Sequence, residues 1–453
     1  MSQSRNHKDM LSAPIGKTLK DMTIPMVMGM IALMSFNLID TFFISLLGTQ
    51  ELAAISFTFP VTFTVISLTI GLGIGTSAVI AKTIGQKHYH LAKDQATTAL
   101  IVAVILVAGL STLGWFVIEP LFLLLGSDQH TQPFITAYMK IWYFSSVFLV
   151  IPMVGNAILR SSGDTKTPSL IMALGGAINA LLDPLFIFGW GDFQGWGIEG
   201  AAIASLIAWM IGAAVMLYLL SYKRQLIDLA LPGAQAFVQA TKSILKIGIP
   251  AAGANMLTPI AMSILTAIVA GYGHEAVAAF GVGSRIESIA CMLVLAMSMT
   301  LPPFISQNLG AGQNERVQQA YKMSCRFVLF WQLGVFVLLA LCAPIISRVF
   351  AQEAEVQDLI QLFIWIVPLG YGLQGIVILT NSSFNALHQP SIALKLSILR
   401  LFVFYVPCAY LGGLLFDIWG LFVGCVVGNA LMASVSYIRF NRHFNQVELQ
   451  VQP

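Results

Sequence analysis

The chain has 453 residues, of which 57% are hydrophobic and only 9% are charged, and its mean hydropathy is +0.82. Soluble domains carry about 25% charged residues, so this composition indicates a protein whose surface is covered largely by lipid. The net charge is +3, and no basic stripe is interleaved with aromatic residues, so the sequence gives no sign of nucleic-acid binding. The five cysteines stand singly inside apolar runs, which indicates packing residues and neither a metal site nor a disulfide framework.

Apolar runs long enough to cross a bilayer follow one another along the whole chain. A spanning helix needs about 20 mostly apolar residues. Twelve runs meet this requirement, and the connections between them are short: 23–47, 52–82, 94–118, 134–159, 167–189, 198–222, 243–271, 276–308, 317–349, 359–386, 391–415 and 418–440. The predicted fold class is therefore an all-α polytopic membrane protein with twelve transmembrane helices.

The basic residues predict the orientation of these spans. Nineteen of the 23 Lys and Arg residues fall in the two terminal segments and in alternate loops, for example Arg5 and Lys8 before the first span and Lys87 after the second. Because cytoplasmic loops carry the excess of Lys and Arg, both termini are expected in the cytoplasm. The expected location is the bacterial inner membrane.

The two halves of the chain repeat each other. Ala53 and Ala54 align with Ala278 and Ala279, and Pro25 and Gly85 align with Pro250 and Gly310 at the same offset. Two repeats of six spans must insert the same way up, which is a transporter architecture with the site between the halves. We expect two pseudo-symmetric six-helix lobes, residues 1–222 and 243–453, joined by a cytoplasmic linker, residues 223–242.

Two carboxylates lie inside the spans of the first half. Asp40 is eight residues from Gly48 and Asp183 is six residues from Gly189, which places them roughly 12 Å and 9 Å from the outer helix ends at about 1.5 Å per residue. Charged residues within a span are functional candidates, since they are costly to bury in lipid. Burial and a second nearby carboxylate both favour a protonated form, so the pair is a candidate proton or cation site.

Polar and apolar neighbours extend this candidate site. Met172, Gly176, Asn179 and Asp183 recur at intervals of four, three and four residues, so they share one helix face. Pro184 follows directly and weakens the backbone hydrogen bonding there. Pro25 and Gly29 are candidate bend points in the first span, or an ordinary helix-entry proline and a packing glycine.

The repeat supplies an internal control for the polar cluster. The second half has apolar residues at the positions that correspond to Asp40, Asn156, Asn179 and Asp183, namely Leu265, Ile378, Phe402 and Val406. A comparable bundle therefore forms without these polar groups, which favours a functional role over a structural one.

The order of several loop motifs resembles a known transporter family. IGQKHYHLA and LGAGQNERVQQA follow the second and eighth spans, RSSGDTKTP follows the fourth, and GIEGAAIA opens the sixth. With the twelve spans and the repeat, they resemble the multidrug and toxic compound extrusion (MATE) family over essentially the whole chain. Asp40, Asn156, Asn179 and Asp183 resemble its DinF-type branch.

This resemblance implies two lobes facing a central cleft and cation-driven export of amphipathic, often cationic organic compounds. It implies that the four DinF-type positions surround a polar cavity in the amino-terminal lobe. A hydroxyl residue that helps hold a cation in some relatives is Ala201 here, which favours protons over sodium. No cofactor, resident metal or enzymatic activity is expected, and the protein is expected to be a monomer.

Other residues have two open interpretations. Four residues of the first half are candidates to line a substrate cavity: Phe36, Tyr138, Met172 and Ala201. Phe36 and Tyr138 could stack on a flat cationic drug or serve as core aromatics. Arg285, Glu287 and Arg400 could line the cleft from the second lobe or lock helices together. The sequence GLGIGTS, residues 71–77, predicts close helix packing rather than nucleotide binding, because no strand precedes it. A lipid-linked sugar flippase of related architecture and a sodium-coupled exporter remain alternatives. An intramembrane enzyme and a channel fit less well.

The predicted orientation can be tested by cysteine labelling in intact cells. A cysteine introduced at Gln50 should react with a membrane-impermeant thiol reagent, because the loop after the first span is expected outside. A cysteine at Lys87 should react only after the membrane is permeabilised. The reverse labelling pattern would overturn the orientation.

Overall fold

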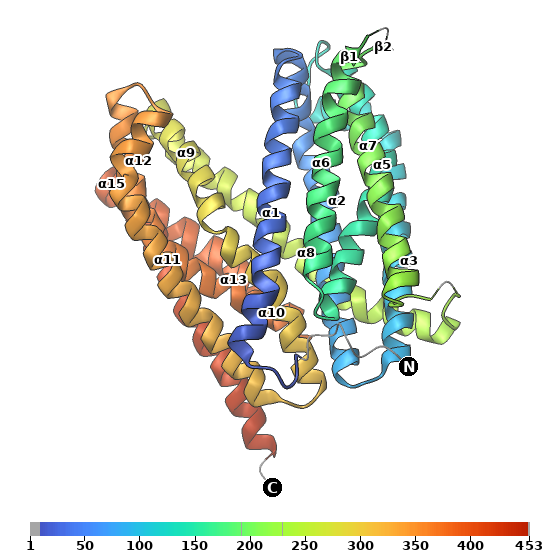
Figure 1. Cartoon of the computed structure of the whole chain (residues 1–453). Helices are drawn as coiled ribbons and strands as arrows, with labels where there is room; N and C mark the ends of the chain where they lie inside the picture. Colours follow the sequence, from blue (N-terminus) through green and yellow to red (C-terminus); the bar gives the residue numbers. More distant parts are fainter. Residues whose placement is uncertain (1–9, 192, 229, 452–453) are drawn as a thin grey trace. The chain divides into compact units, whose positions relative to one another are not determined.

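The computed structural model describes residues 10–191, 193–228 and 230–451, which form two compact units (Figure 1). Unit 1 comprises residues 21–252, and unit 2 comprises residues 10–20 and 253–451. Helices α1 (Ile15–Ser45) and α8 (Ala234–Ala270) have residues in both units. The predicted lobes, residues 1–222 and 243–453, and their linker stay a prediction. Arg5 and Lys8, which entered the prediction of orientation, lie outside the described residues.

Unit 1 is built from helices and one small hairpin. Between α1 and α8 it contains, in chain order, α2 (Thr49–Gly85), α3 (Tyr89–Phe116), α4 (Ile118–Leu124), α5 (Gln132–Ser161), α6 (Lys166–Phe188), β1 (Gly189–Trp190), β2 (Phe193–Gln194), α7 (Gly197–Tyr218) and the π-helix η1 (Leu219–Lys223).

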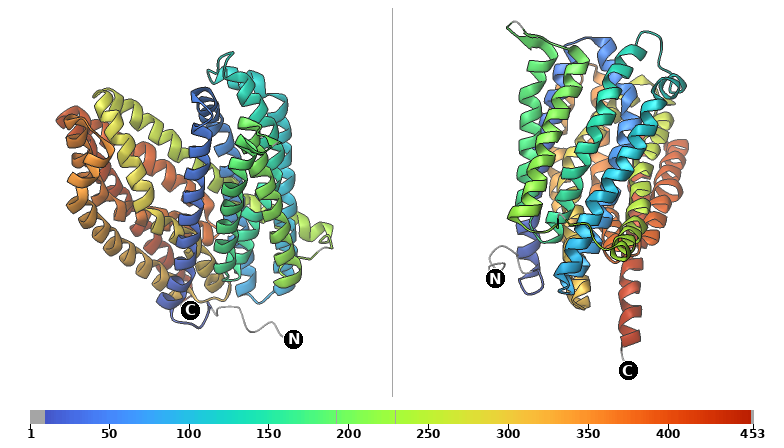
Figure 2. Two further views of the ribbon diagram at one scale, coloured as in Figure 1. Left: turned by 45° about the horizontal axis from the view of Figure 1, so that its top comes forward. Right: turned by 90° about the vertical axis from the view of Figure 1, so that its right-hand side faces the viewer.

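Unit 2 continues from α8 and is helical throughout its described residues. It contains α9 (His274–Ala290), α10 (Met292–Gly310), α11 (Asn314–Phe350), α12 (Ala354–Ile366), the 3₁₀ helix η2 (Val367–Gly370), α13 (Tyr371–Ala386), α14 (Pro390–Ile398), the π-helix η3 (Leu399–Tyr405) and α15 (Val406–Val451). The last turns of α15 project beyond the other helices of this unit (Figure 2).

The helices confirm the prediction of an all-α polytopic membrane fold. Eleven helical segments of the described chain are long and apolar enough to span a bilayer. The last of them, Pro390–Phe444, contains a break at Phe416 and Asp417, whose backbone angles are not helical. It therefore supplies two spans, which agrees with the predicted runs 391–415 and 418–440 and gives twelve spans.

A β-hairpin between α6 and α7 is the one departure from helices among the described residues. Gly189 pairs with Gln194 and Trp190 pairs with Phe193 in an antiparallel ladder at the top of unit 1 (Figure 1). The predicted elements did not include it, since two residues per strand are too short to produce an alternating pattern.

Helix α5 organises the core of unit 1. It packs against α2, α3 and α7, and its side chains Trp142 and Tyr143 are buried. Its Ser146 hydroxyl lies 2.7 Å from that of Ser111 on α3, so a hydrogen bond joins the two helices inside the apolar core.

Two glycines of α2 allow this helix to approach α8 closely within unit 1. A Cβ atom on Gly71 would lie 2.4 Å from the carbonyl oxygen of Gly248, and one on Gly75 would lie 2.5 Å from that of Ile244. Only glycine fits such a backbone contact, which confirms the close helix packing predicted for GLGIGTS.

Helices α1 and α6 also lie side by side (Figure 1). A Cβ atom on Gly29 would lie 2.8 Å from the Cα atom of Ser169, and one on Gly176 would lie 2.2 Å from the Phe36 ring. Helix α1 runs without interruption through both Pro25 and Gly29, so Pro25 is an interior proline rather than a helix-entry proline. The proposed bending at these two residues stays a prediction.

Replacing Gly176 with alanine should loosen the contact between α1 and α6. The added methyl group meets the Phe36 ring and its Cβ atom, and overpacking of this kind costs about 1–3 kcal/mol. We expect Gly176→Ala to lower the thermal unfolding temperature of the purified protein by several degrees.

Gly175→Ala is the matched control, because a Cβ atom there has no neighbour within 4 Å. The control should be neutral or slightly stabilising, since alanine favours a helix over glycine by about 1 kcal/mol. Equal unfolding temperatures for the two variants would contradict the packing of Phe36 on Gly176.

Candidate functional site

The contact between α1 and α6 determines where the two carboxylates of unit 1 meet. Gly29 and Gly176 admit the neighbouring helix, and the Ser169 hydroxyl lies 3.8 Å from the Met26 sulfur. With the helices in this register, the carboxyl of Asp40 lies within hydrogen-bonding reach of the carboxyl of Asp183. The structure thus brings together two residues that are 143 positions apart in the sequence.

Asn179 holds the Asp183 carboxyl in place. Its side-chain nitrogen donates hydrogen bonds to Asp183 Oδ1 and to Ser205 Oγ on α7, both at 3.2 Å. Asp183 is completely buried, whereas Asp40 is only partly buried. Asp183 is therefore fixed by α6 and α7, and Asp40 is the more exposed residue of the pair.

The second oxygen of Asp183 shows what the pair requires. Asp183 Oδ2 is buried, and no N–H or hydroxyl group of the described residues donates a hydrogen bond to it. A hydrogen bond between the Asp40 and Asp183 carboxyls forms only when one of the two groups is protonated and donates to the other. Two adjacent ionised carboxylates repel each other, whereas one shared proton turns the contact into a strong hydrogen bond. The geometry therefore suits a proton, or a cation, held between Asp40 and Asp183.

Helix α5 contributes two further predicted residues. Tyr138 is close enough to Asp40 and Asp183 to interact electrostatically with both. Asn156 is 7% exposed, and its side-chain oxygen has no hydrogen-bond partner among the described residues. None of the hydrogen bonds described for the chain joins Asn156 to the carboxyl pair, so its part in the site stays a prediction.

The other residues predicted to line a substrate cavity in unit 1 differ in exposure. Phe36 packs over Gly176, one turn of α6 before Asn179, and Met172 is partly buried on the same face. Ala201 is 2% exposed and packs with Ile44 and Ile187 in a small apolar cluster. Ala201 is thus surrounded by apolar side chains.

Unit 2 has a separate polar cluster. Glu287 on α9 accepts a 2.9 Å hydrogen bond from the side-chain nitrogen of Gln374 on α13, and its charge interacts with Arg400 on η3. Arg285, two residues from Glu287, is exposed. The two α9 residues therefore lie in different surroundings. Gln374 is a hydrogen-bond partner of Glu287 that is distant in the sequence.

Sequence reasoning missed two hydrogen-bonding residues, Ser205 and Gln374. Each is an uncharged polar residue in an apolar span. A search of the spans for such residues would have identified both. Within the described chain, no group of three or more His, Cys, Asp or Glu side chains has the arrangement of a metal site.

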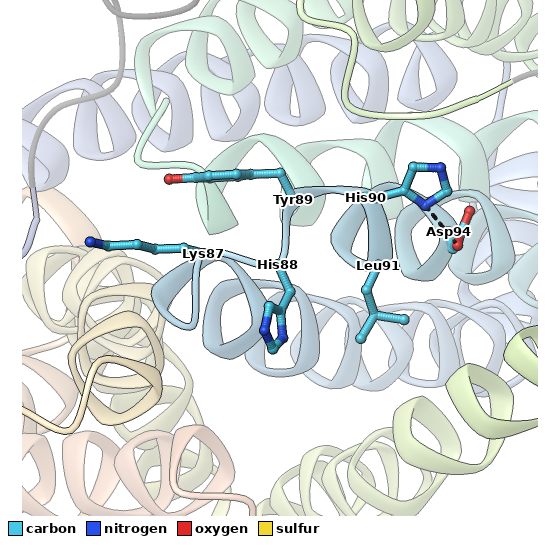
Figure 3. A pocket seen from close by; sticks show the side chains of 6 residues that line it. All are labelled: Lys87, His88, Tyr89, His90, Leu91 and Asp94. Carbon is cyan, nitrogen blue, oxygen red and sulfur yellow. Dashed lines mark ion pairs between the residues drawn. The ribbon is translucent and has the colours of Figure 1, made fainter.

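A shallow depression at the loop between α2 and α3 is not the candidate site. It is lined by Lys87, His88, Tyr89, His90, Leu91 and Asp94. Figure 3 shows that these side chains point in different directions and that His90 pairs with Asp94, at 3.4 Å. Because the side chains diverge, they do not enclose a ligand.

Comparisons with known proteins agree with this architecture. The MatE family model matches residues 25–185 and 250–411, one stretch in each half of the chain. The chain is 41% identical to an FAD transporter of Shewanella oneidensis over 433 residues, covering 96% of both proteins. It is 26% identical to a probable multidrug resistance protein, YpnP, of Bacillus subtilis, over 94% of this chain and 96% of that protein.

A solved structure shows the same fold. The bent form of the Vibrio cholerae MATE transporter VcmN superposes with a TM-score of 0.91 at 34% identity, covering 97% of this chain and 99% of that one. A family model that matches most of the chain, a full-length relative and a full-length structural match lead to one assignment. The chain belongs to the MatE family and is a multi-pass membrane transporter, not an enzyme.

Proposed function

We propose that this transporter is a cation-coupled antiporter that uses protons to export amphipathic organic compounds by alternating access. The observation that carries the proposal is the contact between the Asp40 and Asp183 carboxyls among apolar helices, in which Asp183 is buried and is oriented by Asn179. Asp40, Asn156, Asn179 and Asp183 also resemble the DinF-type branch of the family, and this resemblance implies that they surround a polar cavity in the amino-terminal lobe.

The coupling follows from electrostatics. A proton from the outer, acidic side joins the carboxyl pair and favours one arrangement of the transporter. Its release to the cytoplasm is assisted by the membrane potential, which contributes about 2.3 kcal/mol per charge per 100 mV. Transport requires that the protonated and deprotonated states bind cargo with different affinity, because a ligand with equal affinity for both states shifts nothing.

Proton use is favoured over sodium by the surroundings of the pair. Sodium prefers several oxygen ligands, as hard cations do. Ala201 supplies no side-chain oxygen, and its neighbours Ile44 and Ile187 are aliphatic. A single proton needs only the two carboxyls.

Two classes of cargo have support. The name of the B. subtilis relative and a carboxyl pair that becomes negative on proton release favour organic cations, with Phe36 and Tyr138 as stacking partners. The S. oneidensis relative, which is far more similar, favours a flavin nucleotide, FAD. An aromatic ring system is common to both classes.

The same transporter is expected in the bacterial inner membrane. Bacterial relatives and the distribution of basic residues favour the inner membrane with both termini in the cytoplasm. The repeat favours two six-helix lobes, residues 1–222 and 243–453. A lipid-linked sugar flippase is the weaker alternative, because an acidic pair lies where such a protein needs basic residues for a pyrophosphate.

Reconstituted transport tests this proposal. Purified protein in liposomes should move ethidium or FAD against its gradient when a proton gradient is imposed, and should not when only a sodium gradient is imposed. Asp183→Asn should reduce proton-driven transport at least tenfold, because an amide at this buried position cannot share the proton with Asp40.

Glu287→Gln, the matched change in unit 2, should retain proton coupling, because Glu287 contacts an amide and not a second carboxyl. Loss of coupling in Glu287→Gln with normal coupling in Asp183→Asn would assign the proton site to unit 2 and refute the proposal. Transport driven by sodium alone would favour the sodium-coupled exporter.

A further inference from the structure

The polar cluster of unit 2 has an arrangement that the carboxyl pair does not explain. Glu287, Gln374 and Arg400 come from α9, α13 and η3, three elements that are separate in the sequence. Gln374 occupies one oxygen of Glu287. Although Glu287 acts electrostatically on Arg400, no ion pair within 4.0 Å joins them among the ion pairs of the described residues.

Arg400 has donors that the protein does not use. Its Nε atom is buried and lacks a hydrogen-bond partner among the described residues, although a guanidinium carries five N–H donors. The hydroxyl of Tyr371, which is only 1% exposed and also interacts with the Glu287 charge, is likewise without a partner within the described chain. Buried donors without acceptors are costly, so a group that accepts from them would be stabilised there.

The backbone at Arg400 is unusual as well. Arg400 lies in the π-helix η3, which interrupts the α-helical path between α14 and α15. Such π-helical turns are rare and occur frequently at functional sites. Arg400 as a whole is partly exposed, although its Nε atom is buried.

The repeat again provides an internal control. By the alignment of the two halves, Glu287 and Arg400 correspond to Thr62 and Ala177, and Gln374 corresponds to Pro152. The first half therefore builds a corresponding bundle without this cluster. The fold does not require an arginine at this position.

We propose that Arg400 and Tyr371 form a binding site in unit 2 for a phosphate group of an anionic cargo, such as a flavin nucleotide. The inference rests on the proposed transport function and narrows its substrate class. Arginine suits this role because its planar fork binds two phosphate oxygens at once. Glu287 balances the charge of Arg400 in the absence of cargo, and Gln374 occupies one oxygen of the Glu287 carboxylate.

Equilibrium binding to the purified full-length protein tests the site. FMN and riboflavin are the probes, since they share the same ring system and differ by one phosphate. The wild-type protein should bind FMN more tightly than riboflavin. Arg400→Gln should lower the FMN affinity at least tenfold and bring it close to that of riboflavin, and Arg400→Lys should have a smaller effect, because it keeps the charge but not the fork.

Two further variants separate ligand binding from helix locking and from general charge. Glu287→Gln should raise FMN affinity, because it removes a negative charge beside the phosphate, whereas loss of a locking partner would only destabilise the protein. Arg348→Gln removes an exposed positive charge of unit 2 and should leave FMN affinity unchanged. Thermal unfolding of each variant shows whether it is folded.

Equal wild-type affinity for FMN and riboflavin, or an equal loss of both in Arg400→Gln, would overturn the phosphate site. So would an equal effect of Arg348→Gln, which would indicate long-range attraction only. Proton-driven transport by the wild-type protein is measured separately. A wild-type protein that binds FMN through Arg400 but moves no cargo would refute the proposed transport mechanism and leave the binding site intact.

Discussion

The contact between two carboxyls inside an apolar helix bundle is the constraint on which the account of this transporter depends. Asp40 and Asp183 reach each other because Gly29 and Gly176 let α1 lie directly against α6. Asn179 then ties Asp183 to Ser205 on α7, so that one acid of the pair is fixed and the other is more accessible. Two neighbouring carboxylates with little water around them repel each other, so binding of a positive charge between them is favourable. A proton is the smallest group that can supply it.

The two halves of the chain have corresponding helices but carry different polar residues. The first half carries an acidic pair where the second has Leu265 and Val406, and the second half carries Glu287 and Arg400 where the first has Thr62 and Ala177. Neither polar cluster is therefore needed to build its bundle. Such a division fits a transporter in which one repeat responds to the coupling ion and the other recognises the cargo.

The sequence was sufficient to predict the helices and to identify the acidic residues of the site, because both predictions depend on local patterns. Asp40 and Asp183 stood out as charges in apolar runs, and the spacing of Gly176, Asn179 and Asp183 placed them on one helix face. The dip in hydropathy at Asp417 marked the break in the last long helical segment. Contacts across helices had no such signal: Ser205 is 26 residues from Asn179, and Gln374 is 87 residues from Glu287. The hairpin after α6 and the π-helix at Arg400 were also not predicted, since neither changes the apolar periodicity of the sequence.

Infrared difference spectroscopy of the purified protein tests most directly whether the carboxyl pair holds a proton that leaves when cargo binds. A protonated carboxyl has a C=O stretching band that is absent from the ionised form. We expect cargo addition to remove such a band in the wild-type protein, and we expect neither Asp40→Asn nor Asp183→Asn to show this loss. A wild-type spectrum without the loss, or an equal loss in both variants, would contradict a proton shared by Asp40 and Asp183.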